Sequence, residues 1–285
     1  MAIRIINLLT IIILIANTIF GQNYEPVDLA KKIFSKDSFP DFDNYITGEY
    51  KGEPNGKNLQ NGLTTKFLSL EQTENTAVVA MTLLDPLGKG VDSYLYFQKD
   101  SIWKMSAFRS LAMTEIIHRA KYELEKMTPK EVNSIIAKSK KKKKKNTAET
   151  FMFSSKEDYN FQLGNMKLIL ELDENIIKHF IANQAEFERL KNRAVAQLDK
   201  QKEDDESNKT LIEDLKSDYQ KVFIYSVSAG DYELGNNINF LIGGIGDNVV
   251  GYIYVKDKND LPKMNSSGII MLREIGNGWY IYKTT

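Results

Sequence analysis

The chain has 285 residues, no cysteine, and 38 basic residues against 38 acidic ones. The lack of cysteine excludes a disulfide framework, a cysteine-ligated metal and a cysteine nucleophile. The balanced charge excludes a global field that steers the protein toward nucleic acid or a membrane, so any electrostatic role has to be local.

The N-terminal residues 1–22 are mostly apolar. They carry one charge, Arg4, followed by an apolar run from Ile5 to Phe20. A membrane span needs about 20 apolar residues, so this shorter run is typical of a signal peptide, with the small residue Gly21 at its end. We therefore expect removal of the segment and export to the periplasm or the exterior. Retention as an N-terminal membrane anchor is the alternative.

Residues 23–139 are predicted to form a first α+β module. A short helix is expected near Pro26–Phe34, before a loop rich in Gly and Asn. Apolar residues recur at helical spacing over Arg109–Met127, which predicts an amphipathic helix lying on the sheet of this module. That sheet comprises four strands joined by tight turns that favour antiparallel pairing, near residues 65–72, 76–84, 91–99 and 102–108.

A second helix is expected from Thr128, because Thr128 and Glu131 have the spacing of a capping box. It runs into six consecutive lysines, Lys140, Lys141, Lys142, Lys143, Lys144 and Lys145. Adjacent lysines repel one another and are solvated, so residues 140–150 are predicted to be a linker. The run is also a candidate contact for anionic envelope surfaces. No aromatic residues interleave with the lysines, which argues against a nucleic-acid partner.

Residues 151–285 are predicted to form a second α+β module. It begins with a strand-like run at Tyr159–Leu172, interrupted by Gly164 and Asn165. A helix with an apolar stripe follows from Asp173. Five strands are then expected near residues 222–228, 238–242, 249–256, 268–274 and 279–283, the last two joined by a Gly-Asn-Gly hairpin turn. The predicted fold class is α+β, with two modules that are each an antiparallel β-meander packed against helices.

The two modules share a strand pattern. Each has a Tyr-x-Tyr strand, followed in the chain by a strand that contains one of the two tryptophans. Such rings can line a binding cleft, but core packing and cross-strand pairing are the favoured interpretation. The candidate ligand-lining residues are Tyr94, Tyr96, Trp103, Tyr252, Tyr254 and Trp279. A weaker similarity between the two modules is the tripeptide Leu-Gly-Asn, which occurs as Leu163-Gly164-Asn165 and as Leu234-Gly235-Asn236.

The first module resembles cystatin-like and nuclear-transport-factor-2-like folds. The resemblance covers about Glu25–Met127 and depends on the order of elements, on Val78-Val79 and on Ile102-Trp103-Lys104-Met105. It implies a curved sheet folded around a helix, with a cone between them that is either filled or open. Proteins with these folds include isomerases, dehydratases, ligand-binding modules and interaction domains, so the resemblance implies no single function.

The whole chain also resembles a family of exported bacterial proteins that carry the segment Gly48–Gly56, GEYKGEPNG, ahead of the first sheet. This resemblance implies export and no particular activity.

Acid–base candidates are few. The histidines, His118 and His179, have no acid or nucleophile at a known catalytic spacing, and no metal or cofactor motif is present. The leading hypothesis is an exported, non-enzymatic binding or interaction protein with a protein or small-molecule partner. The alternatives are a pocket enzyme that uses Asp85, Asp92 or His118 in the first module, and an envelope-associated protein that contacts anionic surfaces through the lysine run.

Overall fold

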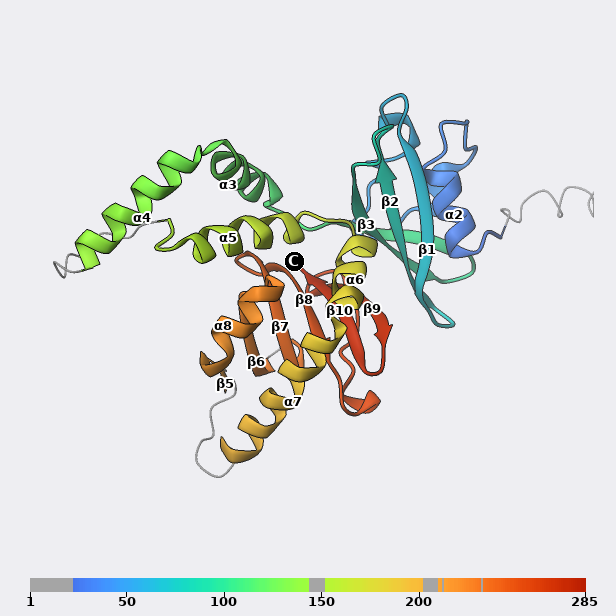
Figure 1. Cartoon of the computed structure of the whole chain (residues 1–285). Coiled ribbons are helices and arrows are strands. Elements are labelled where there is room, and N and C mark those ends of the chain that lie inside the picture. Colours follow the sequence, from blue (N-terminus) through green and yellow to red (C-terminus); the bar gives the residue numbers. More distant parts are fainter. Residues whose placement is uncertain (1–22, 144–151, 202–209, 212, 232) are drawn as a thin grey trace, which may run out of the picture. The chain divides into compact units, whose positions relative to one another are not determined.

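The computed structural model describes residues 23–143, 152–201, 210–211, 213–231 and 233–285 (Figure 1). The predicted signal peptide, residues 1–22, lies outside the described residues. The chain divides into two compact units, Met1–Arg109 and Ser110–Thr285. This division falls at the end of a strand and earlier than the linker predicted at residues 140–150. Along the described parts of the chain, no helix combines the length and the apolar character that crossing a membrane requires.

The first unit is one helix on a four-stranded sheet. The sheet is an antiparallel meander in the order β1-β2-β3-β4, as predicted. The elements are α2 (Pro26–Ile33), the 3-10 turns η1 (Phe42–Tyr45) and η2 (Gly56–Asn58), β1 (Thr64–Gln72), β2 (Thr76–Leu84), β3 (Gly90–Lys99) and β4 (Trp103–Arg109).

The core of the first unit lies between α2 and one face of the sheet. Leu29 of α2 packs in one buried cluster with Val79, Leu95 and Trp103. Successive strand residues point to opposite faces. Tyr94, the neighbour of Leu95, therefore lies on the face that does not contact α2.

The second unit has a larger sheet in the order β5-β6-β7-β8-β10-β9. Its strands are β5 (Thr210–Leu211), β6 (Ser226–Asp231), β7 (Gly235–Ile245), β8 (Asn248–Tyr254), β9 (Ile269–Gly276) and β10 (Trp279–Thr284). Its helices are α3 (Thr114–Lys126), α4 (Pro129–Lys143), α5 (Lys156–Ile169), α6 (Asp173–Ala182), α7 (Gln184–Gln201) and α8 (Lys216–Tyr219), with 3-10 turns η3 (Glu213–Leu215), η4 (Gln220–Val222) and η5 (Lys258–Asp260). The fold class is α+β, with two antiparallel sheets.

The second sheet is not the simple meander that was predicted. The β9–β10 hairpin forms as expected, but β10 pairs with β8 and leaves β9 at the edge. The connection of residues 255–268 is long enough to carry the chain past the position of β10. The hairpin then returns the chain to the gap beside β8.

Two helix predictions change in the structure. The run Tyr159–Leu172 was predicted as a strand, and this was wrong because it forms most of α5. The helix α3 was expected on the first sheet but belongs to the second unit, where its Leu124 packs with Val132 of α4 and Phe153. The predicted capping box of α4 does form, since Glu131 accepts a hydrogen bond from the Thr128 N–H at 2.8 Å.

The apolar stripe predicted after Asp173 is confirmed, although it spans two helices. Asn183 interrupts the helix between α6 and α7, and its N–H bonds to the carbonyl of Phe180 at 3.0 Å. The stripe residues that are buried are Ile176, Phe180, Phe187, Leu190 and Ala194.

Candidate ligand-binding groove between helices α5 and α6

A groove of about 610 Å³ runs between α5 and α6 in the second unit. Its volume falls within the range of sites that hold small molecules. The floor is largely apolar and comprises Leu163, Gly164, Leu168, His179 and Phe223. The groove therefore combines residues from two adjacent helices with one residue that follows η4.

Phe223 is the central residue of the floor. On one side its ring lies against Gly164 of α5, where a Cβ atom would overlap three ring carbons. On the other side it stacks on the His179 ring, with centroids 5.8 Å apart and an interplanar angle of 29°. Only glycine at position 164 lets the ring approach the helix this closely.

The backbone around Phe223 is held by side chains from both helices. His179 Nε2 lies 3.1 Å from the carbonyl oxygen of Val222, and Asn165 Nδ2 donates to the carbonyl of Phe223 at 2.7 Å. Asn165 is buried and also donates to the carbonyl of Ile242 on β7 at 2.6 Å. Phe223 has φ +59°, a left-handed conformation that costs a non-glycine residue about 1–2 kcal/mol. These contacts hold the strained residue in place, so the floor is preorganised.

His179 is a neutral structural residue in this arrangement. A carbonyl oxygen can only accept a hydrogen bond, so Nε2 carries the proton that it donates to Val222. Burial lowers the pKa of His179 from its usual 6.5, with the Val222 hydrogen bond opposing the shift. Nδ1 faces the side-chain amide of Asn183 at 3.5 Å. Both ring nitrogens thus face groups of the protein itself.

The rim of the groove is polar, with three charged residues. Lys167 pairs with Glu125 of α3 at 3.1 Å, and Glu171 accepts a hydrogen bond from Asn175 at 2.8 Å. The third, Lys178 on α6, is exposed and has neither an ion pair nor a hydrogen bond within the described part of the chain. Glu171 keeps its negative charge because Asn175 is neutral, and Glu125 is shared by Lys167 and Lys121, so ammonium groups outnumber carboxylates at this rim.

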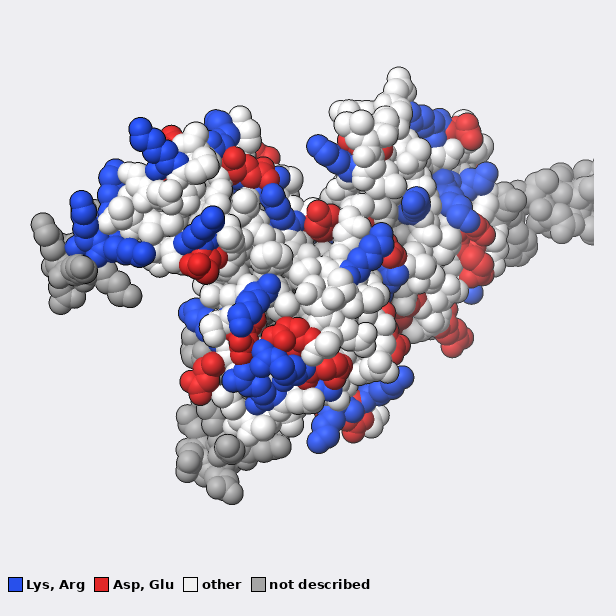
Figure 2. Space-filling view, viewed as in Figure 1, with Lys and Arg blue, Asp and Glu red and all other residues white. Residues whose placement is uncertain are grey.

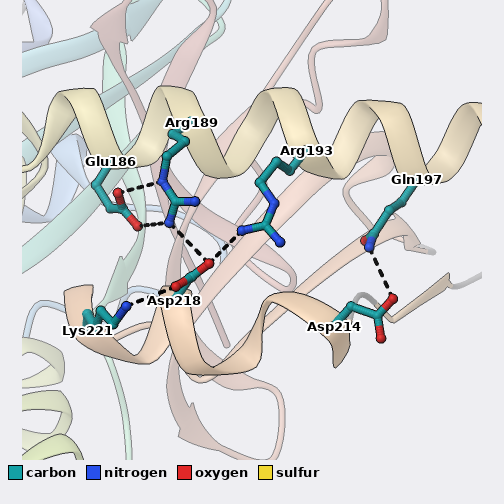
Figure 3. Close-up of polar contacts among 7 residues, drawn as sticks. All are labelled: Glu186, Arg189, Arg193, Gln197, Asp214, Asp218 and Lys221. Carbon is teal, nitrogen blue, oxygen red and sulfur yellow. Dashed lines mark hydrogen bonds and ion pairs between the residues drawn. The ribbon is translucent and has the colours of Figure 1, made fainter.

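An ion-pair network stabilises the segment that directly precedes Phe223 in the chain (Figure 3). Asp218 of α8 accepts from Arg193 at 2.6 Å and from Lys221 at 3.0 Å, and it lies 3.2 Å from Arg189 of α7. Arg189 also donates to Glu186 at 2.9 Å. These cations hold the pKa of the Asp218 carboxyl well below its usual range, the Lys221 hydrogen bond being the largest cause. The network attaches α8 and η4 to α7.

The predicted aromatic residues lie elsewhere. Trp279 is fully buried, and its Nε1 donates to Glu188 at 2.7 Å. Tyr252 is also fully buried, and its hydroxyl donates to the carbonyl of Ile176 at 2.8 Å. Tyr254 pairs directly with Trp279 across β8 and β10. These three residues form core and cross-strand contacts and are not among those that line the groove.

The Tyr-x-Tyr strands are used differently in the two units. In the first unit Trp103 packs on the α2 side of the sheet with Leu95, whereas Tyr94 and Tyr96 point to the other face. In the second unit the tryptophan and both tyrosines share one face. The similar Leu-Gly-Asn tripeptides at residues 163–165 and 234–236 also have different structures, since Gly164 is helical while Gly235 begins β7 at φ +65°.

The acid–base candidates of the first module have structural partners or are exposed. Asp85 accepts hydrogen bonds from the N–H groups of Leu87 and Lys89, both at 2.8 Å, and so forms the β2–β3 turn. Asp92 is buried and accepts a hydrogen bond from the Thr82 hydroxyl. His118 is exposed on α3. Among the described residues, no cluster of three His, Asp or Glu side chains is placed to hold a metal ion.

The lysine run begins inside a helix. Helix α4 continues through Lys143, and Lys140 and Lys141 are exposed near its C-terminal end. Figure 2 shows basic side chains gathered at this end of α4, whereas basic and acidic side chains alternate over much of the rest of the unit. Lys144 and Lys145 lie outside the described residues.

Sequence reasoning named His179 as an acid–base candidate but did not place it in a groove. Gly164 and Asn165 were noted as a break in a strand and as part of a tripeptide similarity, and Phe223 was placed inside a predicted strand. The one available signal was a Gly-Asn pair inside an apolar run, since such a glycine often marks close packing. Comparison with family models, curated proteins and solved structures found no match.

Proposed function

We propose that this chain is an exported, non-enzymatic binding protein whose second unit holds a small ligand in the α5–α6 groove. The observation that carries this proposal is the preorganised floor, in which Phe223 is held in a strained conformation between Gly164 and His179. Backbone strain of this kind persists where the surrounding structure enforces it, and it clusters at ligand sites. A floor that is already ordered lowers the entropic cost of binding.

A binding role fits the groove better than catalysis. A general base needs a free lone pair directed at the substrate. The His179 Nε2 donates to Val222, and Nδ1 faces Asn183. Export is proposed from the apolar run in residues 1–22.

For the first unit we propose a cystatin-like or nuclear-transport-factor-2-like fold that serves as an interaction module. The support is the single helix α2 on a four-stranded antiparallel meander. Side chains such as Leu29 and Trp103 fill the space between helix and sheet. This filled core favours an interaction role over an enzyme pocket in this unit.

Contact with anionic envelope surfaces is a second proposal, favoured by the exposed Lys140 and Lys141 at the end of α4. Replacing all six lysines of the run by glutamine should abolish binding to anionic vesicles. Unchanged binding would exclude this role.

Native mass spectrometry of the protein purified from its own host tests the main proposal. We expect a reproducible excess mass that disappears on denaturation. The variant Asn160→Trp places a large side chain on the exposed rim and should remove the excess mass by filling the groove. Lys156→Trp, on the same helix outside the groove, is the matched control and should retain it. A wild-type mass equal to the polypeptide, or an excess mass that survives Asn160→Trp, would overturn the proposal.

A further inference from the structure

We infer that the α5–α6 groove selects a monomeric amphiphile with one acidic head group on an apolar body, and that Lys178 binds the head group. This inference rests on the proposed function, because it names the ligand class of the same groove. It follows from the charges of the rim and the composition of the floor, taken together.

The rim and its direct ion-pair partners carry more positive than negative charge. Lys167 and Lys121 share the single carboxylate of Glu125, and Glu171 keeps its negative charge because its hydrogen-bond partner is a neutral amide. Lys178 has no such contact within the described residues. An incoming anion can therefore pair with Lys178 without breaking an existing interaction, whereas a cationic head group would meet a rim where ammonium groups outnumber carboxylates.

The floor provides the second half of the recognition. Leu163, Leu168 and Phe223 present apolar surface along the groove. Burying a hydrocarbon or aromatic body on this surface is favourable because it removes apolar area from water. Lys178 is the immediate chain neighbour of the floor residue His179, so head-group and body sites adjoin.

Neither half suffices alone. A single exposed ion pair contributes little in water, so a small hydrophilic anion should bind weakly. A neutral amphiphile would gain the apolar contact but leave the Lys178 charge beside an apolar body. The combination selects an acidic amphiphile over both.

Isothermal titration of the mature chain with dodecanoate, below its micellar concentration, tests this inference. We expect binding at one molecule per chain, and no measurable binding of acetate. A neutral twelve-carbon alcohol ethoxylate should bind up to about fivefold more weakly, since an exposed ion pair contributes at most about one factor of five.

Charge reversal at Lys178 provides the decisive comparison. Lys178→Glu should weaken dodecanoate binding by about tenfold or more and strengthen binding of dodecyltrimethylammonium. Lys156→Glu, on α5 outside the groove, carries the same charge change and should leave both affinities unchanged. Equal affinity of dodecanoate for the wild type and Lys178→Glu would overturn the inference.

Two further outcomes separate the inference from the proposed function and from a membrane role. If native mass spectrometry finds a neutral or cationic ligand that Asn160→Trp removes, the binding function stands and the acidic ligand class is wrong. Sedimentation with vesicles of phosphatidylglycerol should not depend on Lys178. Co-sedimentation that Lys178→Glu abolishes would place the head group in a membrane and overturn the monomeric ligand.

Discussion

At the scale of single residues, the missing side chain of Gly164 determines how closely α5 approaches Phe223. A glycine inside a helix costs about 1 kcal/mol relative to alanine. Here that cost is offset by the contact with the Phe223 ring, which in turn stacks on His179. The groove floor therefore requires glycine at position 164, although helix propensity alone favours alanine there.

The variant Gly164→Ala should reveal this conflict. Helix propensity predicts stabilisation, but the added Cβ overlaps the Phe223 ring, and such overpacking costs about 1–3 kcal/mol. We expect net destabilisation in urea unfolding. In the background of Phe223→Ala the same change should become neutral or stabilising, because the ring is gone. Stabilisation by Gly164→Ala alone would contradict the packing described here.

His179 should give stability a defined pH dependence. Its folded-state pKa is lowered by burial, so the unfolded chain takes up the proton first as pH falls. The free energy of unfolding should be highest above the unfolded pKa of about 6.5 and decline as pH falls toward the folded-state value. His179→Gln retains a donor for Val222 without titrating and should remove this slope in urea titrations.

The matched control for this prediction is His118→Gln. His118 is exposed on α3, so its replacement should leave the slope unchanged. A slope that survives in His179→Gln would show that another group causes it.

At the scale of elements, α5 shows why a local pattern misled. Met166 packs toward α3 and α4, while Phe161 and Ile169 are buried on other faces of the helix. A helix that is apolar on several faces lacks a single apolar stripe, so its sequence pattern cannot be distinguished from that of a buried strand. Its N-terminus carried a usable signal, since Ser155 accepts a hydrogen bond from the Asp158 N–H at 3.0 Å.

The strand predicted over residues 222–228 was placed too early, since β6 begins at Ser226. Residues 222–225, Val-Phe-Ile-Tyr, have high strand propensity, yet Val222 ends η4 and Phe223 is left-handed. The carbonyl contacts with His179 and Asn165 outweigh the propensity of this stretch. Tertiary contacts commonly override strand propensity.

The ion-pair network between α7 and α8 should stabilise the groove segment. Asp218→Asn keeps the shape of the side chain but leaves Arg189, Arg193 and Lys221 without their shared carboxylate. We expect a lower melting temperature at low salt, and a smaller difference at high salt because exposed charges are screened. Since the folded pKa of Asp218 is lowered, its contribution is present above the usual carboxyl range and lost as pH falls through the folded value.

The control for this network is Asp28→Asn. Asp28 forms an isolated exposed pair with Lys31 on α2, and such pairs contribute little. An equal loss of melting temperature in both variants would remove any special role for the network.

At the scale of the whole molecule, two compact units form separate cores. The first is built around α2 and its meander, and the second around the aromatic cluster that includes Trp279 and Phe187. Separate cores lead us to expect separate local stabilities.

Leu29→Ala should test this separation. Leu29 is fully buried in the first core, and its truncation should cost about 2–5 kcal/mol. Hydrogen exchange should become faster for amides of β2 and β3, while the protection of β7 and β8 is unchanged. Leu190→Ala on α7, also fully buried, should have the reciprocal effect. Equal acceleration in both units would mean that they unfold as one.

The sequence by itself determined the α+β class, the four-stranded meander, the capping box of α4 and the apolar stripe of α6 and α7. These features follow from spacing within a short stretch of chain, where the periods of helices and strands apply directly. Only the tertiary structure decided that α5 is a helix, that β10 lies beside β8, and that Phe223 reaches the groove. Those outcomes depend on contacts between residues far apart in the chain, such as Gly164 with Phe223 and Asn165 with Ile242. The spacing of residues within a short stretch of sequence does not predict such contacts, because residues far apart in the chain become neighbours only in the folded structure.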